Sequence, residues 1–130
     1  MSIDAQQIRD TIHRYFDYFA EGDADGIVDL FATDAFIEDP VGSPRVQGHD
    51  ALRAFYRAGF EHTGGITLKA EGAVRVAGNT GACAALGYCE KANPPFYFET
   101  LDVMTFGADG KILSMLAYWG PDNHHPLPRE

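Results

Sequence analysis

The stretch Gly64–Ala70, with the sequence GGITLKA, separates two different sequence patterns. Two consecutive glycines disfavour the continuation of a helix, and after them apolar and polar residues alternate with a period of two. This alternation continues to Val76 and predicts one long strand from Ile66 to Val76 with a single buried face. The chain therefore changes from a helical pattern to a strand pattern at this point.

Before Gly64 the pattern predicts three helices. In the first, from Asp4 to Glu21, apolar residues recur at helical spacing, and Asp4 and Gln7 are placed as a capping pair. The second begins after Asp23, carries the apolar stripe of Ile27, Leu30 and Phe31, and is expected to end near Thr33 and Asp34. The third is expected from about Asp50 to the glycine pair.

Turn signals divide the rest of the chain into three further strands, roughly Thr80–Glu90, Phe96–Phe106 and Lys111–Trp119. The last segment, residues 121–130, is expected to be irregular. Helices followed by an antiparallel meander indicate an α+β fold, in which three N-terminal helices cover a curved, mostly antiparallel sheet and leave a cone-shaped cavity. With 130 residues and no repeat, the whole chain 1–130 is expected to form a single domain.

The charge balance argues against two classes of partner. With 10 Lys and Arg against 19 Asp and Glu, the formal charge is −9, which repels nucleic acid and anionic membranes. No basic leader and no apolar run of about 18 residues is evident. Cys83 and Cys89 would lie about 20 Å apart on one strand, too far to bond with each other. Free thiols fit a reducing compartment, so we expect a cytoplasmic protein.

Asp102 is the first candidate functional residue. Strand alternation places it on the same face as Phe98, Met104 and Phe106. A carboxylate among these side chains must find a partner or stay protonated, because desolvation raises the pKa of an acid. Two further possibilities stay open, namely a different strand register and a carboxylate bonded to backbone N–H groups at a bulge.

Asp39 lies in the stretch Phe36–Gly42, FIEDPVG, where Asp-Pro is typical of a turn. A register that buries Ile37 directs Asp39 inward as well, which also allows a base in an apolar pocket. Tyr15 and Tyr56 lie on the apolar sides of their helices, so each hydroxyl needs a partner. Either tyrosine can equally be a structural residue that bonds a backbone carbonyl.

Two carboxyl groups and a phenol, without a nucleophile, a phosphate loop or metal-ligand spacing, suggest proton transfer at carbon. The aromatic residues nearby imply an apolar, rigid substrate, and no cofactor or metal is expected. His124 and His125 in the tail are expected to be solvated, because no third metal ligand lies at a suitable spacing.

Two blocks of the chain, residues 14–59 and 101–120, closely resemble the ketosteroid isomerases (steroid Δ5-isomerases) of the nuclear transport factor 2-like fold. The likeness rests on the order and spacing of Tyr15, EDPVG, AFYR and DVM. The resemblance implies that Asp39 is the base and that Tyr15 and Asp102 bond the oxyanion, while Tyr56 supports Tyr15. Ketosteroid isomerases are themselves the known example of a carboxylic acid held neutral in an apolar site, so the role of Asp102 follows from the resemblance alone. By the same matching, the steroid pocket would be lined by Phe19, Phe55, Val74, Met104 and Trp119.

The resemblance implies that Asp39 takes a proton from C4 of a 3-oxo-Δ5-steroid and returns it at C6, by way of a dienolate. It also implies a homodimer. Some relatives carry a further tyrosine in the second helix, where this chain has Phe31. Two alternatives remain: a polyketide cyclase resembling SnoaL, which would not need both Tyr15 and Asp102, and a non-catalytic binder of steroids or lipids.

Overall fold

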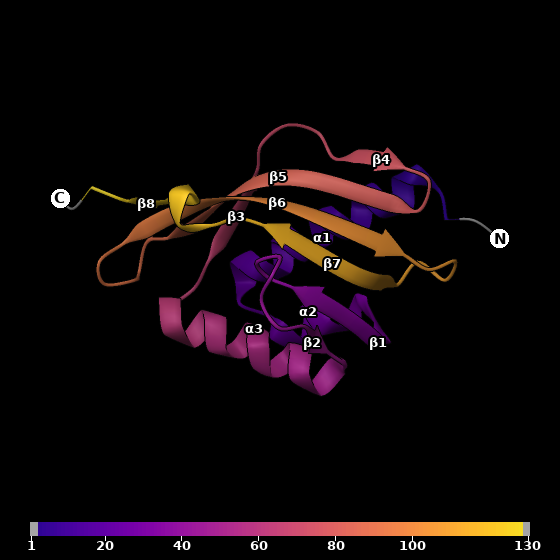
Figure 1. The fold of residues 1–130 in the computed structure, drawn as a ribbon, viewed down its shortest axis with the longest axis horizontal. Coiled ribbons are helices and arrows are strands. Elements are labelled where there is room, and N and C mark those ends of the chain that lie inside the picture. Colours follow the sequence, from indigo (N-terminus) through magenta and orange to yellow (C-terminus); the bar gives the residue numbers. More distant parts are fainter. Residues whose placement is uncertain (1–2, 129–130) are drawn as a thin grey trace.

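The computed structural model describes residues 3–128 and has the expected α+β fold, with three helices on an open, curved sheet (Figure 1). The sheet has the strand order β2-β1-β7-β6-β5-β3, and two short strands, β4 and β8, pair with β5 and β6. The helices are α1 (Ala5–Glu21), α2 (Ala24–Asp29) and α3 (His49–Thr63). The strands are β1 (Phe31–Glu38), β2 (Val46–Gln47), β3 (Thr67–Ala70), β4 (Arg75–Ala77), β5 (Thr80–Cys89), β6 (Phe96–Phe106), β7 (Ile112–Tyr118) and β8 (His124–Pro126).

Helix α1 has the predicted limits and the predicted cap. The Asp4 side chain accepts a hydrogen bond from the Gln7 backbone N–H at 2.8 Å, and the Gln7 side chain accepts one from the Asp4 N–H at 3.0 Å. Gly22 ends the helix in the left-handed conformation, with φ +67°. The buried stripe of α1 covers the inner face of β3, β4 and β5, and Figure 1 shows the helix behind the long strands.

The second helix is shorter than predicted. It ends at Asp29, and Phe31, which the helical stripe had included, is the first residue of β1. Strand β1 pairs in parallel with β7, far along the chain, with Phe31 opposite Ile112 and Ile37 opposite Met115. Because Phe31 is buried in either conformation, the hydrophobic pattern does not distinguish a helix from a strand here.

The third helix begins one residue before the predicted start and ends at the glycine pair, as expected. The single long strand predicted from Ile66 to Val76 is wrong, because the chain breaks at Gly72, where φ is +87°. Its two parts, β3 and β4, pair with different halves of β5. Burial alternates in both parts.

The three-stranded meander is confirmed, with end shifts of one residue in β5 and in β7. The tail is not irregular over its described part, which corrects the prediction for residues 121–128. A 3-10 turn at Pro121–Asn123 leads into β8, which pairs with the beginning of β6 and places His124 opposite Phe98. In Figure 1, β8 lies at the opposite end of the molecule from β4.

The core fills the end of the sheet near β4. Here Ile8 and Ile12 of α1 lie directly on Gly81 of β5, where a Cβ atom would come within 2.5 Å of Ile8 Cγ2. Val74 and Met104 belong to the same core and are buried. None of the helices within residues 3–128 combines the length and hydropathy needed to cross a lipid bilayer.

Candidate active site

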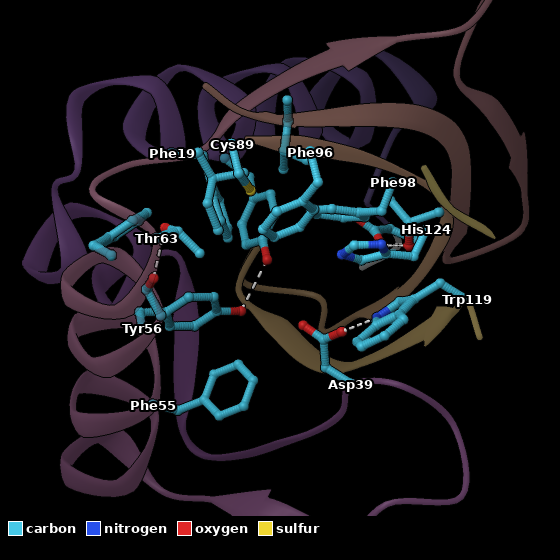
Figure 2. Close-up of a pocket in the computed structure, with 17 residues that line it drawn as sticks. Phe19, Asp39, Phe55, Tyr56, Thr63, Cys89, Phe96, Phe98, Trp119 and His124 are labelled. Carbon is cyan, nitrogen blue, oxygen red and sulfur yellow. Dashed lines mark hydrogen bonds between the residues drawn. The ribbon is translucent and has the colours of Figure 1, made fainter. Parts of the chain in front are cut away.

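A cavity of about 270 Å³ opens at the other end of the inner face of the sheet (Figure 2). Its walls come from α1, α3, β3, β5, β6 and β8 and from the segments that follow β1 and β7. Most of the wall is apolar. The predicted site residues that line this cavity are Tyr15, Phe19, Asp39, Phe55, Tyr56, Asp102 and Trp119.

Tyr15 and Tyr56 form the phenol pair of the cavity, with their hydroxyl oxygens 2.9 Å apart. Tyr15 is 1% exposed, and burial raises its pKa well above the ordinary value, as do the neighbouring Tyr56, Asp102 and Asp39. Burial also raises the pKa of Tyr56. Both phenols are therefore neutral near pH 7. When Tyr56 donates in this pair, the proton of Tyr15 is free to point into the cavity.

Asp102 lies at the inner face of β6 and is 4% exposed. Thr100 Oγ1 donates a hydrogen bond to Asp102 Oδ1 at 3.1 Å. Burial, together with the charge of Asp39, raises the pKa of Asp102 to about 7. The register shift between β6 and β7 falls at Thr105 and Phe106, so the predicted face of Asp102 holds and no bulge lies at this residue. In its protonated form the carboxyl group is a hydrogen-bond donor.

Asp39 follows the last residue of β1, and its carboxylate accepts a hydrogen bond from Trp119 Nε1 at 2.6 Å. Burial raises the pKa of Asp39, and the bond from Trp119 partly opposes this. The neighbouring Glu38 takes a different direction and pairs with Arg45 at 3.2 Å. Asp39 is thus a turn residue and a cavity residue at once. In Figure 2 its carboxylate and the Tyr56 hydroxyl point toward the same part of the cavity.

Two residues predicted to line the cavity lie elsewhere. Met104 is on the inner face of β6, but two residues beyond Asp102, about 7 Å further along the strand, where α1 covers the sheet. Val74 lies between β3 and β4, close to Gly81 in the same closed core. The alternation of a strand predicts which face a side chain occupies. It does not predict at which residue along that face the packed core ends and the cavity begins.

Several lining residues were not among the predicted ones. Phe96, Phe98 and Thr100 share the alternating face of Asp102, so the pattern that identified Asp102 contained the signal for them. His124 had no such signal, because it reaches the cavity only through the pairing of β8 with β6.

The tail histidines were predicted to be solvated, and the structure shows His124 exposed and His125 partly buried, each with a side-chain contact. His124 stacks on Phe96 with ring centroids 4.2 Å apart. His125 Nε2 lies 2.6 Å from Glu99 Oε1. Within residues 3–128, no group of three or more His, Cys, Asp or Glu side chains is arranged to hold a metal ion.

The polar groups of the cavity have complementary properties. A carboxylate at Asp39 can accept a proton, and the charge of Asp39 acts on the pKa of both Tyr15 and Asp102, so the three groups lie within electrostatic reach. The Tyr15 phenol and the protonated Asp102 carboxyl are both hydrogen-bond donors that line the cavity. Such a set can remove a proton from carbon next to a carbonyl group and stabilise the enolate that forms.

The comparisons with known proteins agree on the fold and give two kinds of chemistry. The sequence model described as a SnoaL-like domain matches residues 12–115. The "Steroid Delta-isomerase" of Nocardioides simplex is 36% identical over 116 residues, which cover 88% of this chain and 91% of that protein. A solved structure of the epoxide hydrolase/cyclase-like enzyme SalBIII, described with a role in pyran ring formation in polyether salinomycin, has a TM-score of 0.86 and 27% identity, and the match covers 95% of this chain and 98% of that one.

Proposed function

The chain belongs to the SnoaL-like family, and from that premise we propose that it is a steroid Δ-isomerase, which moves the double bond of a 3-oxo-Δ5-steroid to the Δ4 position. The observation that carries the proposal is the presence of Asp39, Tyr15 and Asp102 in one apolar cavity. The 36% identity to a steroid isomerase supports it. The aromatic side chains of the wall suit a rigid, apolar substrate.

In the proposed reaction the substrate carbonyl oxygen accepts hydrogen bonds from Tyr15 and from protonated Asp102. Asp39 takes a proton from C4, which leaves a dienolate, and returns it at C6. The indole N–H of Trp119 occupies Asp39 Oδ1, so Oδ2 is the oxygen that carries the proton. Because the same side chain takes and returns the proton, the reaction needs no cofactor.

The reaction requires different ionisation of the two carboxyl groups. Asp102 is enclosed and has no cationic partner within residues 3–128, and with a pKa of about 7 it keeps its proton in about half of the molecules at pH 7. An oxyanion beside Asp102 would raise this pKa further and favour the protonated form. Burial raises the pKa of Asp39, and the hydrogen bond from Trp119 opposes this shift and favours the charged form. The same cavity thus supports one donor acid and one base.

The direct test follows the ultraviolet absorbance of the conjugated enone after the protein is mixed with 5-androstene-3,17-dione. We expect turnover by the wild type and a loss of about 10²–10⁴-fold in kcat for Asp39→Asn. Glu38→Gln is the matched control, because Glu38 pairs with Arg45 and does not line the cavity. A wild type without turnover, or an Asp39→Asn variant with full activity, would contradict the proposal.

A second candidate function is cyclisation of a polyketide-type substrate with an enolisable carbonyl. The SnoaL-like family and the structural similarity to a cyclase-like enzyme favour this alternative. The same experiment separates the candidates. Steroid binding without turnover favours a binding protein, and the absence of both binding and turnover favours a cyclase.

We further propose that the protein is a homodimer that associates through the outer face of its sheet. Leu101 and Tyr118 are 40% and 48% exposed on this face. The registers of β5, β6 and β7 form two apolar rows there, Ala84–Leu101–Tyr118 and Ala82–Val103–Leu116. Such a self-complementary patch suits a two-fold interface. Leu101→Glu should give a monomer in analytical ultracentrifugation, and Ala51→Glu, on the exposed side of α3, should not.

A cytoplasmic location and the absence of a metal requirement are also proposals. Cys83 and Cys89 are both free and buried, which suits a reducing compartment. Dialysis against a chelator should leave kcat unchanged, and a loss that added metal restores would contradict the proposed chemistry.

A further inference from the structure

His124 is a polar residue of the cavity that the proposed reaction leaves unused. It lies on β8, the short strand that follows the turn at Pro121–Asn123. Because neighbouring residues of a strand point to opposite faces, His124 and His125 are directed to different sides of the sheet. His125 packs against Tyr97 with tilted rings and bonds Glu99, whereas His124 stacks on Phe96 and lines the cavity.

The position of His124 is far from the reacting end of the cavity. It lies opposite Phe98 in the register of β6, and Phe98 precedes Asp102 by four residues. At strand rise this corresponds to about 13 Å. In Figure 2, His124 is seen between Phe98 and Trp119. His124 is exposed, so it stands where the cavity opens to solvent. A rigid substrate whose carbonyl oxygen is bonded by Asp102 and Tyr15, as in the proposed reaction, would extend toward this residue if its long axis follows β6.

The hydrogen bonds of the cavity also distinguish His124. Tyr15 bonds Tyr56, Asp39 bonds Trp119, Asp102 bonds Thr100, and Thr63 donates to the Gly59 carbonyl. The ring nitrogens of His124, in contrast, have no hydrogen-bond partner within residues 3–128, and the ring is held by its stacking on Phe96. The imidazole is therefore oriented by the fold while its N–H group remains available for a ligand.

We propose that His124 binds an oxygen atom at the end of the substrate opposite the reacting carbonyl, so that this chain selects 3-oxo-Δ5-steroids that also carry a ketone or hydroxyl group at C17. An imidazole N–H donates to a ketone oxygen and can donate to a hydroxyl group as well. The identity of the substrate rests on the proposed function. The role of His124 in recognising a far-end oxygen rests on its place in the cavity.

The experiment compares 5-androstene-3,17-dione with 5-androsten-3-one, which lacks oxygen at C17. The wild type should have a KM for the dione lower by roughly 2- to 12-fold, the range expected for one hydrogen bond. His124→Phe keeps an aromatic ring on Phe96 and removes the donor. It should raise the KM for the dione to that for the monoketone without changing kcat, because the contact is the same before and during proton transfer. His124→Gln, which restores a donor, should recover part of the preference.

A wild type without preference for the dione would overturn this proposal, and so would variants in which both substrates change equally. Calorimetric binding of the products, 4-androstene-3,17-dione and 4-androsten-3-one, separates this inference from the isomerase itself. If neither substrate turns over but the dione binds better to the wild type than to His124→Phe, the role of His124 holds and the isomerase function fails. If neither product binds, both proposals fail.

Discussion

The two ends of the inner sheet face are built from the same strands, β5 and β6, yet one end is filled and the other is open. At the closed end, Ile8 and Ile12 lie on Gly81, and Met104 and Phe106 are buried beside them. At the open end, Phe96 and Phe98 of the same strand border the cavity. Both ends carry apolar residues, so hydrophobicity alone does not separate core from binding site.

The packing around two glycines of β5 distinguishes the closed end of the sheet from the open end. A Cβ atom at Gly81 would lie 2.5 Å from Ile8 Cγ2 and 2.8 Å from Ile12 Cδ1, so the missing side chain admits helix α1. A Cβ atom at Gly87 would overlap the ring of Phe98, so the missing side chain admits an aromatic ring of the neighbouring strand. Gly81 therefore allows helix α1 to pack directly on the sheet, whereas Gly87 allows the Phe98 ring, which lines the cavity, to lie across β5.

The polar groups of the site lie on the boundary between these ends. Tyr15 is on α1 one turn after Ile12, and Asp102 is on β6 two residues before Met104. The packed core therefore fixes the positions of the phenol and the carboxyl group from one side, while their other side faces the cavity. This arrangement favours preorganised donors.

The largest expected effect is a difference in the free energy of unfolding between a substitution at the closed end and one at the open end. Met104→Ala should lower the free energy of unfolding by about 2–5 kcal/mol, because it opens a hole in a filled core, and should leave the KM for the steroid unchanged. Phe98→Ala should cost less stability, because part of its ring borders the cavity, and should raise KM. Urea denaturation and steady-state kinetics measure the two effects. A larger increase in KM for Met104→Ala than for Phe98→Ala would break the comparison.

The next effect is the change in kcat when the tyrosines between the core and the cavity are substituted. Tyr15→Phe should lower kcat by about 10²–10³-fold, because it removes one donor to the oxyanion. Tyr56→Phe should lower kcat by only about 2- to 12-fold, the effect of one hydrogen bond to the partner phenol. The urea midpoints serve as a check that both variants fold. Equal losses in the two variants would mean that Tyr15 has no direct contact with the substrate.

Substitution of each of the two glycines by alanine gives a matched pair of variants with smaller expected effects. Gly81→Ala should destabilise the protein by about 1–3 kcal/mol, because the added methyl group meets two buried isoleucines in a filled core. Gly87→Ala should cost less stability and raise KM, because the Phe98 ring can move into the cavity. Unfolding and kinetic measurements on the same preparations test this. A Gly87→Ala variant less stable than Gly81→Ala would show that the open end cannot adjust.

The last effect is the pH dependence of stability, which is measured as a slope per pH unit. Burial raises the pKa of Asp102 to about 7 from 3.8, so between these values the folded protein keeps a proton that the unfolded chain has released. Stability therefore falls as pH rises through this window, and Asp102 contributes at most about 1.4 kcal/mol per pH unit. The raised pKa of Asp39 acts in the same direction.

Asp102→Asn should remove this contribution, whereas Asp17→Asn, at an exposed position of α1, should not. Urea midpoints measured at several pH values within the window give the slope for each protein. An Asp102→Asn variant with the wild-type slope would mean that Asp102 is ionised alike in the folded and unfolded states.

Much of the fold was predictable because its signals are local. Three features follow from residues within a few positions of each other: the cap at Asp4 and Gln7, the end of α1 at Gly22, and the face of β6 that carries Asp102. The break at Gly72 and the early end of α2 were missed. Phe31 belongs to β1 because it pairs with β7, some 80 residues later in the chain. A pattern of neighbouring residues carries no information about such a distant partner.

The composition and periodicity of the chain, taken alone, determined an acidic α+β protein with a buried face on each helix and strand, and with an acid among aromatic residues. Local sterics and hydrophobic spacing suffice for these features. Only the tertiary structure decided where the core stops, so that Asp102 borders a cavity and Met104 does not, and which tail residue enters that cavity. These depend on strand pairing and on close packing between segments distant in sequence, which the spacing of residues along one segment does not specify.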